Sequence, residues 1–181
     1  MRGWLLLGAL GQVSSCRDRA APERPPIQRP LEDSGSPAPQ APQTPRPLGP
    51  RVVLRGPGHA PVTVSVEVAR ENATCTQGLM YRRELAEDRG MVFLFREQHH
   101  LQFWMHNTLV RLDMVFIRQD RTVLGIVKNA TPRTDDIREV PGDSRYVLEV
   151  RGGFADRHGI SPDDVVEFVD IPDPDRPPNC D

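Results

Sequence analysis

The residues best suited to chemistry lie in one short stretch, FWMHNTLVRLDMVFI, at Phe103–Ile117. Asn107, Thr108 and Asp113 interrupt two apolar runs there, and both runs have the residue types of β-strands. A carboxylate among large hydrophobic side chains costs several kcal/mol unless it finds a partner or faces an opening. If the two runs pair as a hairpin, Asn107 and Thr108 lie at one lip of it with Asp113 facing them.

Two interpretations of this polar trio are open. It is either a hydrogen-bonded staple that fixes the hairpin turn, or the polar part of a ligand-binding cleft. In the second case Arg82 joins the cleft, because a planar guanidinium can pair with Asp113 or hold a carboxylate or phosphate. The predicted ligand-binding residues are Met80, Arg82, Trp104, Met105, Asn107, Thr108 and Asp113.

An enzymatic alternative uses Asp113 as the acid or base, with Glu149 as its partner. It requires an open pocket and a carboxyl with a raised pKa. Glu149 alternates with Leu148 and Val150, a pattern that equally fits the wet face of a strand. The sequence shows no nucleophile elbow, Walker loop or zinc motif, so no catalytic residue is assigned.

A copper-handling alternative rests on the clustering of soft ligands. Met91 and Met114, however, lie in apolar runs where methionine is expected as a flexible core filler. Core packing is the better interpretation, and we expect no metal and no cofactor. The residues considered are Met80, Met91, Met105, Met114, His99, His100 and His106.

The N-terminus has the features of an export signal. Arg2 precedes a short apolar run, and Val13-Ser14-Ser15 precedes Cys16, which resembles a bacterial lipobox. We therefore expect a signal peptide at 1–15, a lipid on Cys16, and an exported protein anchored in the cell envelope. By analogy with lipoproteins, Arg17 favours the outer membrane, facing the periplasm.

Proline marks the segments that flank the folded unit. Ten of the nineteen prolines fall at 17–50 and four at 172–178. We predict a polyproline-like tether at 16–50, a domain at 51–171 and a flexible tail at 172–181. The net charge of -2 gives no overall basic field, so nucleic acid is not an expected partner. A Cys75–Cys180 disulfide suits an exported protein, but the sequence leaves it open.

Strand-like and helix-like patterns fill the domain and predict a mostly β (α+β) fold. Helices are expected at about Cys75–Leu85, behind a Thr74–Gln77 capping box, and at Phe154–His158, ended by Gly159. The fold class is a small β-sandwich or barrel of about seven strands with two short helices. Strands are expected at 51–54, 62–69, 91–95, 103–107, 112–117, 122–128, 146–150 and 165–169.

Three segments together resemble the DUF192 family: GLMYRRELAEDRGMVFLF at 78–95, FWMHNTLVRLDMVFI at 103–117, and YVLEVRGGFADRHGI at 146–160. The resemblance covers about residues 62–169. It implies a mostly β domain, often exported or lipid-anchored, with no settled activity, substrate or cofactor. The arginine of the family's GLM-x-R motif is Arg82. His106 and Arg111 depart from the family, which commonly has a cation and a proline there, and His106 binds an anion only when protonated.

The sequence favours a membrane-tethered, non-catalytic module that binds a small molecule or a partner protein of the envelope. The alternatives are an envelope hydrolase or transferase that uses Asp113, a copper handler, and a structural envelope protein.

Overall fold

The computed structural model describes residues 49–171 and residue 180. The predicted signal peptide, Cys16 and the tether up to residue 48 lie outside the described residues, as does the predicted tail apart from Cys180. Neither helix of the described part is long and apolar enough to cross a membrane.

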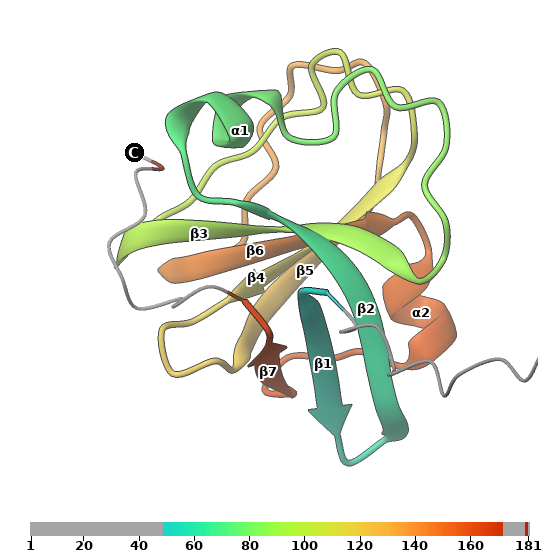
Figure 1. The fold of residues 1–181 in the computed structure, drawn as a ribbon, viewed down its shortest axis with the longest axis vertical. Helices are drawn as coiled ribbons and strands as arrows, with labels where there is room; N and C mark the ends of the chain where they lie inside the picture. The colour runs from blue at the N-terminus through green and yellow to red at the C-terminus, as the bar shows by residue number, and fades with distance from the viewer. Residues whose placement is uncertain (1–48, 172–179, 181) are drawn as a thin grey trace, which may run out of the picture. The chain divides into compact units, whose positions relative to one another are not determined.

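The domain is one seven-stranded sheet with two short helices, so the predicted mostly β class is confirmed (Figure 1). The strand order is β5-β4-β6-β3-β2-β1-β7. The strands are β1 (Arg51–Gly56), β2 (His59–Ala69), β3 (Arg89–His99), β4 (Leu112–Ile117), β5 (Val123–Ala130), β6 (Ser144–Arg151) and β7 (Val165–Val169), and the helices are α1 (Asn72–Gln77) and α2 (Phe154–His158).

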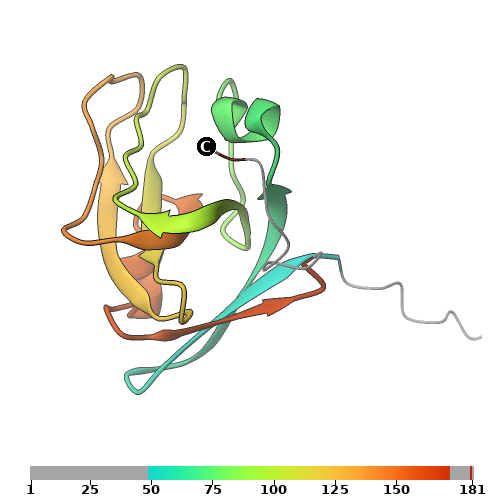
Figure 2. The ribbon, with the colours of Figure 1, turned by 90° about the vertical axis from the view of Figure 1, so that its left-hand side faces the viewer.

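One parallel pair sets the position of the candidate site. All neighbouring strands are antiparallel except β2 and β3. A parallel pair cannot be joined by a tight hairpin, so the chain must cross over the sheet between them. That crossover holds α1 and the segment 78–88. In both ribbon views these residues lie on the same side of the sheet as the loops at 100–111 and 131–143 (Figure 2).

The two edge strands approach each other where β5 begins. The Val123 N–H donates to the Asp164 carbonyl at 2.9 Å, and the Val166 N–H donates to the Arg121 carbonyl at 2.8 Å. An antiparallel bridge joins Thr122 to Val165 between these two bonds. The sheet therefore curls part of the way to a barrel. In the view of Figure 2, β1, β2 and β7 lie below β4, β5 and β6.

The curled sheet has an apolar core on each face, because successive side chains of a strand point to opposite sides. On β6, Tyr146, Leu148 and Val150 face the core that α2 covers. Val147 faces the second core, which segment 78–88 and loop 100–111 cover. A strand with two buried faces reads as a continuous apolar run, and in β6 that run is broken at Glu149.

The predicted helix at Phe154–His158 is confirmed, with Gly159 as its C-cap at φ 71°. The predicted helix Cys75–Leu85 is wrong in both bounds. Glu71 and Thr74 form the capping box, so α1 begins at Asn72. It ends at Gln77, because the C-cap residue Gly78 has a φ of 47° and a ψ of -134°, which cannot continue a helix.

The predicted strand Phe103–Asn107 is also wrong. Phe103 makes a single bridge to Arg138, and the chain then turns at Asn107, whose φ is 52°. β4 pairs with β5 and β6 instead of with this segment. The hairpin that would have brought Asn107 opposite Asp113 does not form.

Candidate functional site

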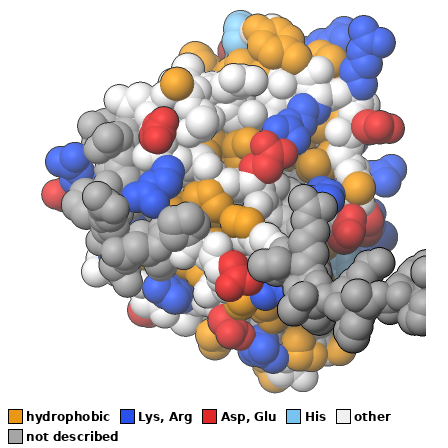
Figure 3. All heavy atoms as spheres, viewed as in Figure 1, with side chains coloured by type: hydrophobic (Ala, Val, Ile, Leu, Met, Phe, Trp, Pro, Cys, Tyr) orange, Lys and Arg blue, Asp and Glu red, His pale blue; other side chains and the backbone are white. Residues whose placement is uncertain are grey.

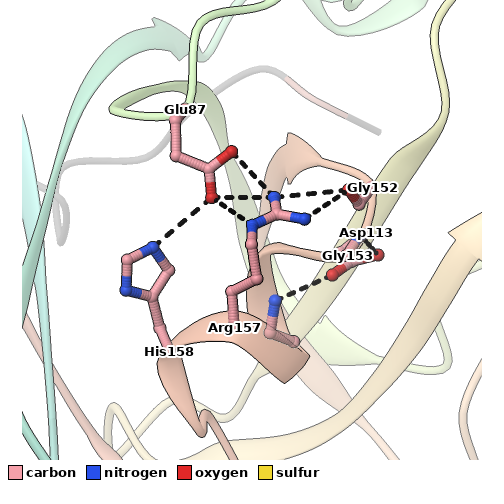
Figure 4. Close-up of polar contacts among 7 residues, drawn as sticks. Glu87, Asp113, Gly152, Gly153, Arg157 and His158 are labelled. Atoms are coloured by element: carbon pink, nitrogen blue, oxygen red, sulfur yellow. Dashed lines mark hydrogen bonds and ion pairs between the residues drawn. The ribbon is translucent and has the colours of Figure 1, made fainter.

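Asp113 lies in β4 and is completely buried. Its Oδ1 accepts from the N–H groups of Asn129 at 2.7 Å and Gly153 at 2.9 Å, and its Oδ2 accepts from the Ala155 N–H at 2.8 Å. Gly153 is the N-cap of α2 and has no side chain to cap the helix. Asp113 therefore supplies from a neighbouring strand the cap that the helix lacks (Figure 4).

The turn that Asp113 holds is braced again from outside. Arg157 of α2 makes two bonds of 2.7 Å to the Glu87 carboxylate and reaches the Gly152 carbonyl at 3.4 Å (Figure 4). His158 lies 3.4 Å from the same carboxylate. These contacts lower the pKa of Glu87, chiefly through the Arg157 hydrogen bonds. Asp113 thus belongs to a structural network, and its burial and three bonds argue against a role as an acid or base.

The structure does not bring the other predicted polar residues to Asp113. The Asn107 amide donates to the Tyr81 hydroxyl at 2.8 Å, and the Asn107 carbonyl accepts from the Tyr81 N–H at 2.9 Å. Arg82 forms a forked pair with Glu67, with one bond of 2.7 Å. The predicted staple between Asn107 and Asp113 across a hairpin is therefore wrong, because Asn107 bonds to Tyr81 and Asp113 bonds to the backbone of Asn129, Gly153 and Ala155.

The remaining predicted residues lie on the other face of the sheet. Met80, Trp104 and Thr108 line a hollow of about 40 Å³, whereas Met105 is completely buried in the second core. We call this the Glu149 hollow, because the carboxyl of Glu149 also lines it. Its lining is Cys75, Thr76, Gln77, Gly78, Leu79, Met80, Phe93, Phe103, Trp104, Thr108 and Glu149.

Glu149 is the residue that the sequence placed wrongly. It is 4% exposed on the central strand β6, between Met91 of β3 and Met114 of β4 in the register of the sheet. Within the described part of the chain, its carboxyl has no hydrogen-bond or ion-pair partner. Burial alone raises its pKa from 4.5 to about 8, because an apolar setting disfavours the charged form.

Gly78 shapes the hollow above this carboxyl. A Cβ at this position would lie 3.3 Å from Cζ of Phe93 and 3.9 Å from Oε2 of Glu149. A side chain here would therefore press against the Phe93 ring of β3. The positive φ of Gly78 is a second reason for glycine, because side-chain-bearing residues rarely adopt this conformation.

A wider groove of about 510 Å³ adjoins the hollow and shares five lining residues with it. We call it the Trp104 groove; its further lining residues include Phe95, Gln102 and Ile137. Trp104 and Ile137 are each 50% exposed, which is unusual for large apolar side chains. Edge-to-face ring contacts with Phe93, Phe95 and Phe116 hold Phe103 in place at 5.2–6.2 Å between centroids.

A disulfide joins Cys75, which lines the groove, to Cys180. The two Cα atoms are 5.9 Å apart, and the bond links positions 105 residues apart in the chain. Cys180 is 2% exposed, with its Sγ 3.7 Å from the Ala69 carbonyl. The pairing that the sequence left open is thus present, and it ties Cys180 to α1.

The methionines and histidines considered for copper are held by other contacts. Met91 and Met114 are buried in the second core, as expected for core fillers, and Met105, which was predicted to bind a ligand, is buried there as well. His100 lies 3.1 Å from Glu139, and His106 lies 2.7 Å from Asp135. The described residues contain no group of three His, Cys, Asp or Glu side chains that could hold a metal ion.

Comparison with known proteins places the chain in a family without an assigned activity. The family model DUF192, described as Uncharacterized ACR, matches residues 52–168. A solved protein of Sinorhizobium meliloti, described as a candidate transcription regulator, is 38% identical, with a TM-score of 0.64 over 67% of this chain and 95% of its own. A Novosphingobium aromaticivorans protein of unknown function is 38% identical, with a TM-score of 0.63 over 65% and 83%. No curated protein matches the chain.

Proposed function

The chain belongs to the DUF192 family, and from the geometry of its groove we propose that the domain binds a small amphipathic molecule. The apolar part of the ligand lies on Trp104, Phe103 and Ile137 in the Trp104 groove. One small polar group reaches through the Glu149 hollow to the Glu149 carboxyl. The groove volume of about 510 Å³ is within the range of small-molecule sites.

The observation that carries this proposal is the unpartnered carboxyl of Glu149. Buried polar groups in native proteins are nearly always hydrogen-bonded, and each exception calls for an explanation. A ligand that bonds to Glu149 gives that explanation, because it satisfies the carboxyl only when the site is filled. The hollow of about 40 Å³ has room for a group about as large as a water molecule.

The protonation state of Glu149 restricts which polar group of the ligand can bind to it. With a pKa of about 8, the carboxyl is mostly neutral at pH 7 and carries an O–H that can donate. A neutral hydroxyl or carbonyl on the ligand is its natural partner. An amine cation is less suitable, because it would favour the ionised carboxylate in a site built from apolar side chains.

The test is a ligand screen on the full chain by saturation-transfer NMR, using neutral aromatic alcohols and amides. We expect hits whose binding weakens at least about tenfold, or about 1.4 kcal/mol, in Trp104→Ala and in Glu149→Leu. Glu149→Gln keeps a neutral donor and should retain binding. Val165→Ala serves as the control, because Val165 is a comparably exposed apolar residue outside the groove. Hits that are insensitive to both Trp104→Ala and Glu149→Leu would rule the groove out.

The setting we propose is the cell envelope, with a lipid on Cys16 and the domain carried on the Pro-rich segment 16–50. The Cys75–Cys180 disulfide supports export, because such bonds persist mainly in oxidising compartments. Cys16→Ser should release the protein from the membrane fraction of a bacterial host. A Cys16→Ser variant that stays in the membrane fraction would contradict the anchor.

A further inference from the structure

A second cavity of about 690 Å³ lies beside the turn that Asp113 holds, and its lining is rich in arginine. We call it the arginine cleft. Arg83, Glu84 and Leu85 line it from segment 78–88, Arg111 from loop 100–111, and Arg151 and Gly152 from the end of β6. Three positive charges therefore face one negative charge in a single cleft.

These three arginines differ from six others in the described part of the chain, which are paired with carboxylates. Arg51, Arg55, Arg82, Arg118, Arg138 and Arg157 each form an ion pair with a carboxylate. Arg83 and Arg151 have no such partner among the described residues, and Arg111 makes only a 3.5 Å contact with the Asn129 carbonyl. All three are exposed. On the face drawn in Figure 3, positive and negative side chains are interspersed.

The backbone that carries these arginines is held firmly. The Gly152 N–H donates to the Arg111 carbonyl at 2.8 Å. This bond joins the end of loop 100–111 to the residue that follows β6. A Cβ on Gly152 would lie 2.8 Å from the Arg111 Cβ, so only glycine allows this approach. Leu85 is 8% exposed and anchors the segment that carries Arg83. The positive charges are therefore mounted on ordered backbone.

We propose that the arginine cleft binds a phosphate-bearing group, as a phosphomonoester or diphosphate. Its excess of two positive charges matches the charge of about -1.5 to -2 on a phosphomonoester near pH 7. Guanidinium groups also hold phosphate oxygens through paired hydrogen bonds. Arg82, which the sequence favoured for this role, is occupied by Glu67, and its neighbour Arg83 takes its place.

The cleft and the Glu149 hollow are lined by consecutive parts of the same three segments. In segment 78–88, Leu79 and Met80 line the hollow and Arg83 lines the cleft. On β6, Glu149 lines the hollow and Arg151 lines the cleft. The phosphate site does not depend on the proposed groove ligand, and the two can be tested separately.

The test is calorimetric titration of the full chain, prepared without lipid, with inorganic phosphate and pyrophosphate. A parallel arm measures cosedimentation with phosphatidylcholine vesicles that contain or lack phosphatidylglycerol, which separates a lipid headgroup from a soluble phosphate. We expect the Arg83→Gln/Arg151→Gln double variant to bind at least about tenfold more weakly than wild type, in whichever of the two assays the wild-type chain binds. The matched control is Arg96→Gln, because Arg96 is exposed and lies outside the cleft.

Loss of binding in the double variant with less than about twofold change in Arg96→Gln supports the site, whichever phosphate source binds. Equal weakening in both variants overturns it, because that reports a general charge effect. Failure of the wild-type chain to bind in either arm overturns it as well. A folded double variant is confirmed by an unchanged thermal midpoint.

Discussion

Two buried carboxyl groups on neighbouring strands of the same sheet have opposite surroundings. Asp113 on β4 accepts three backbone hydrogen bonds on the face that α2 covers. Glu149 on β6 lies on the opposite face, between two methionines and beside a hollow, with no bonding partner in the described part of the chain. Burial is common to both, so it does not distinguish a structural carboxyl from one available to a ligand. The number of donors around each carboxyl does.

The same comparison explains how the two residues contribute to stability. Asp113 accepts from the part-buried N–H of Gly153 and the buried N–H of Ala155, which would otherwise lack an acceptor at the start of α2. Glu149 satisfies nothing, and its burial works against folding whenever it ionises. The domain therefore stabilises the Asp113 carboxyl with hydrogen bonds and buries the Glu149 carboxyl at a cost in free energy. Such a cost is expected where the residue has a function.

The largest effect is expected from Asp113→Ala. This change leaves three backbone N–H groups without their acceptor, the buried one of Ala155 and the part-buried ones of Asn129 and Gly153, and a buried donor left unpaired costs about 1–3 kcal/mol. We expect the free energy of unfolding to fall by about 3 kcal/mol or more, measured by urea denaturation. Glu149→Leu, a change at an equally buried acid, should be neutral or stabilising near pH 7. A loss below about 1 kcal/mol in Asp113→Ala would remove the structural half of the comparison.

The next effect is a dependence of stability on pH that comes from Glu149. Its pKa is raised in the folded state, so folding favours the protonated form. Its contribution is complete below about pH 4.5 and is lost as pH rises to about 8, at about 1.4 kcal/mol per pKa unit. Glu149→Gln should become more stable than wild type by a few kcal/mol between these limits. Parallel denaturation curves at the two ends of the range measure it, and a constant difference would be the contrary outcome.

A smaller effect is expected from a third buried acid, Asp164, which has a side-chain partner. His59 Nε2 lies 3.0 Å from Asp164 Oδ2, and both side chains are nearly inaccessible. The pKa of His59 is raised, first by its hydrogen bond to the Ala60 carbonyl and then by Asp164. This contribution is therefore present below about pH 6.5 and is lost as pH rises through the folded pKa. His59→Gln should cost about 1 kcal/mol at acidic pH and less above neutrality, as thermal midpoints can show. A cost that grows with pH would contradict the sign.

The hydrophobic patterns and cap residues of the sequence predicted correctly those strands and helices that depend mainly on their own residues. β4, β7 and α2 have the predicted bounds, and Gly159 ends α2 as expected. Phe103–Asn107 failed because an apolar run identifies burial but not the partner that buries it. Here the partners are the loop around Arg138 and Tyr81 of the crossover segment.

The sequence predicted the candidate site only in part, because it does not show which distant segments surround each residue. Asp113 attracted attention because it interrupts an apolar run, but its donors come from residues 16 to 42 positions further along the chain. Glu149 in YVLEV resembles the wet face of a strand, since alternation cannot show that loops cover that face. The available signal was the central position of β6 between two apolar strands, and it depends on the strand order.

The most direct test of the central claim is the pKa of Glu149, measured by titrating the side-chain carboxyl carbon in NMR spectra of the folded protein. Loss of the resonance in Glu149→Gln assigns it. A midpoint of about 8 is expected for a carboxyl buried without a partner. A midpoint near 4.5 would show that Glu149 is solvated or paired, and the proposed ligand site would lose its basis.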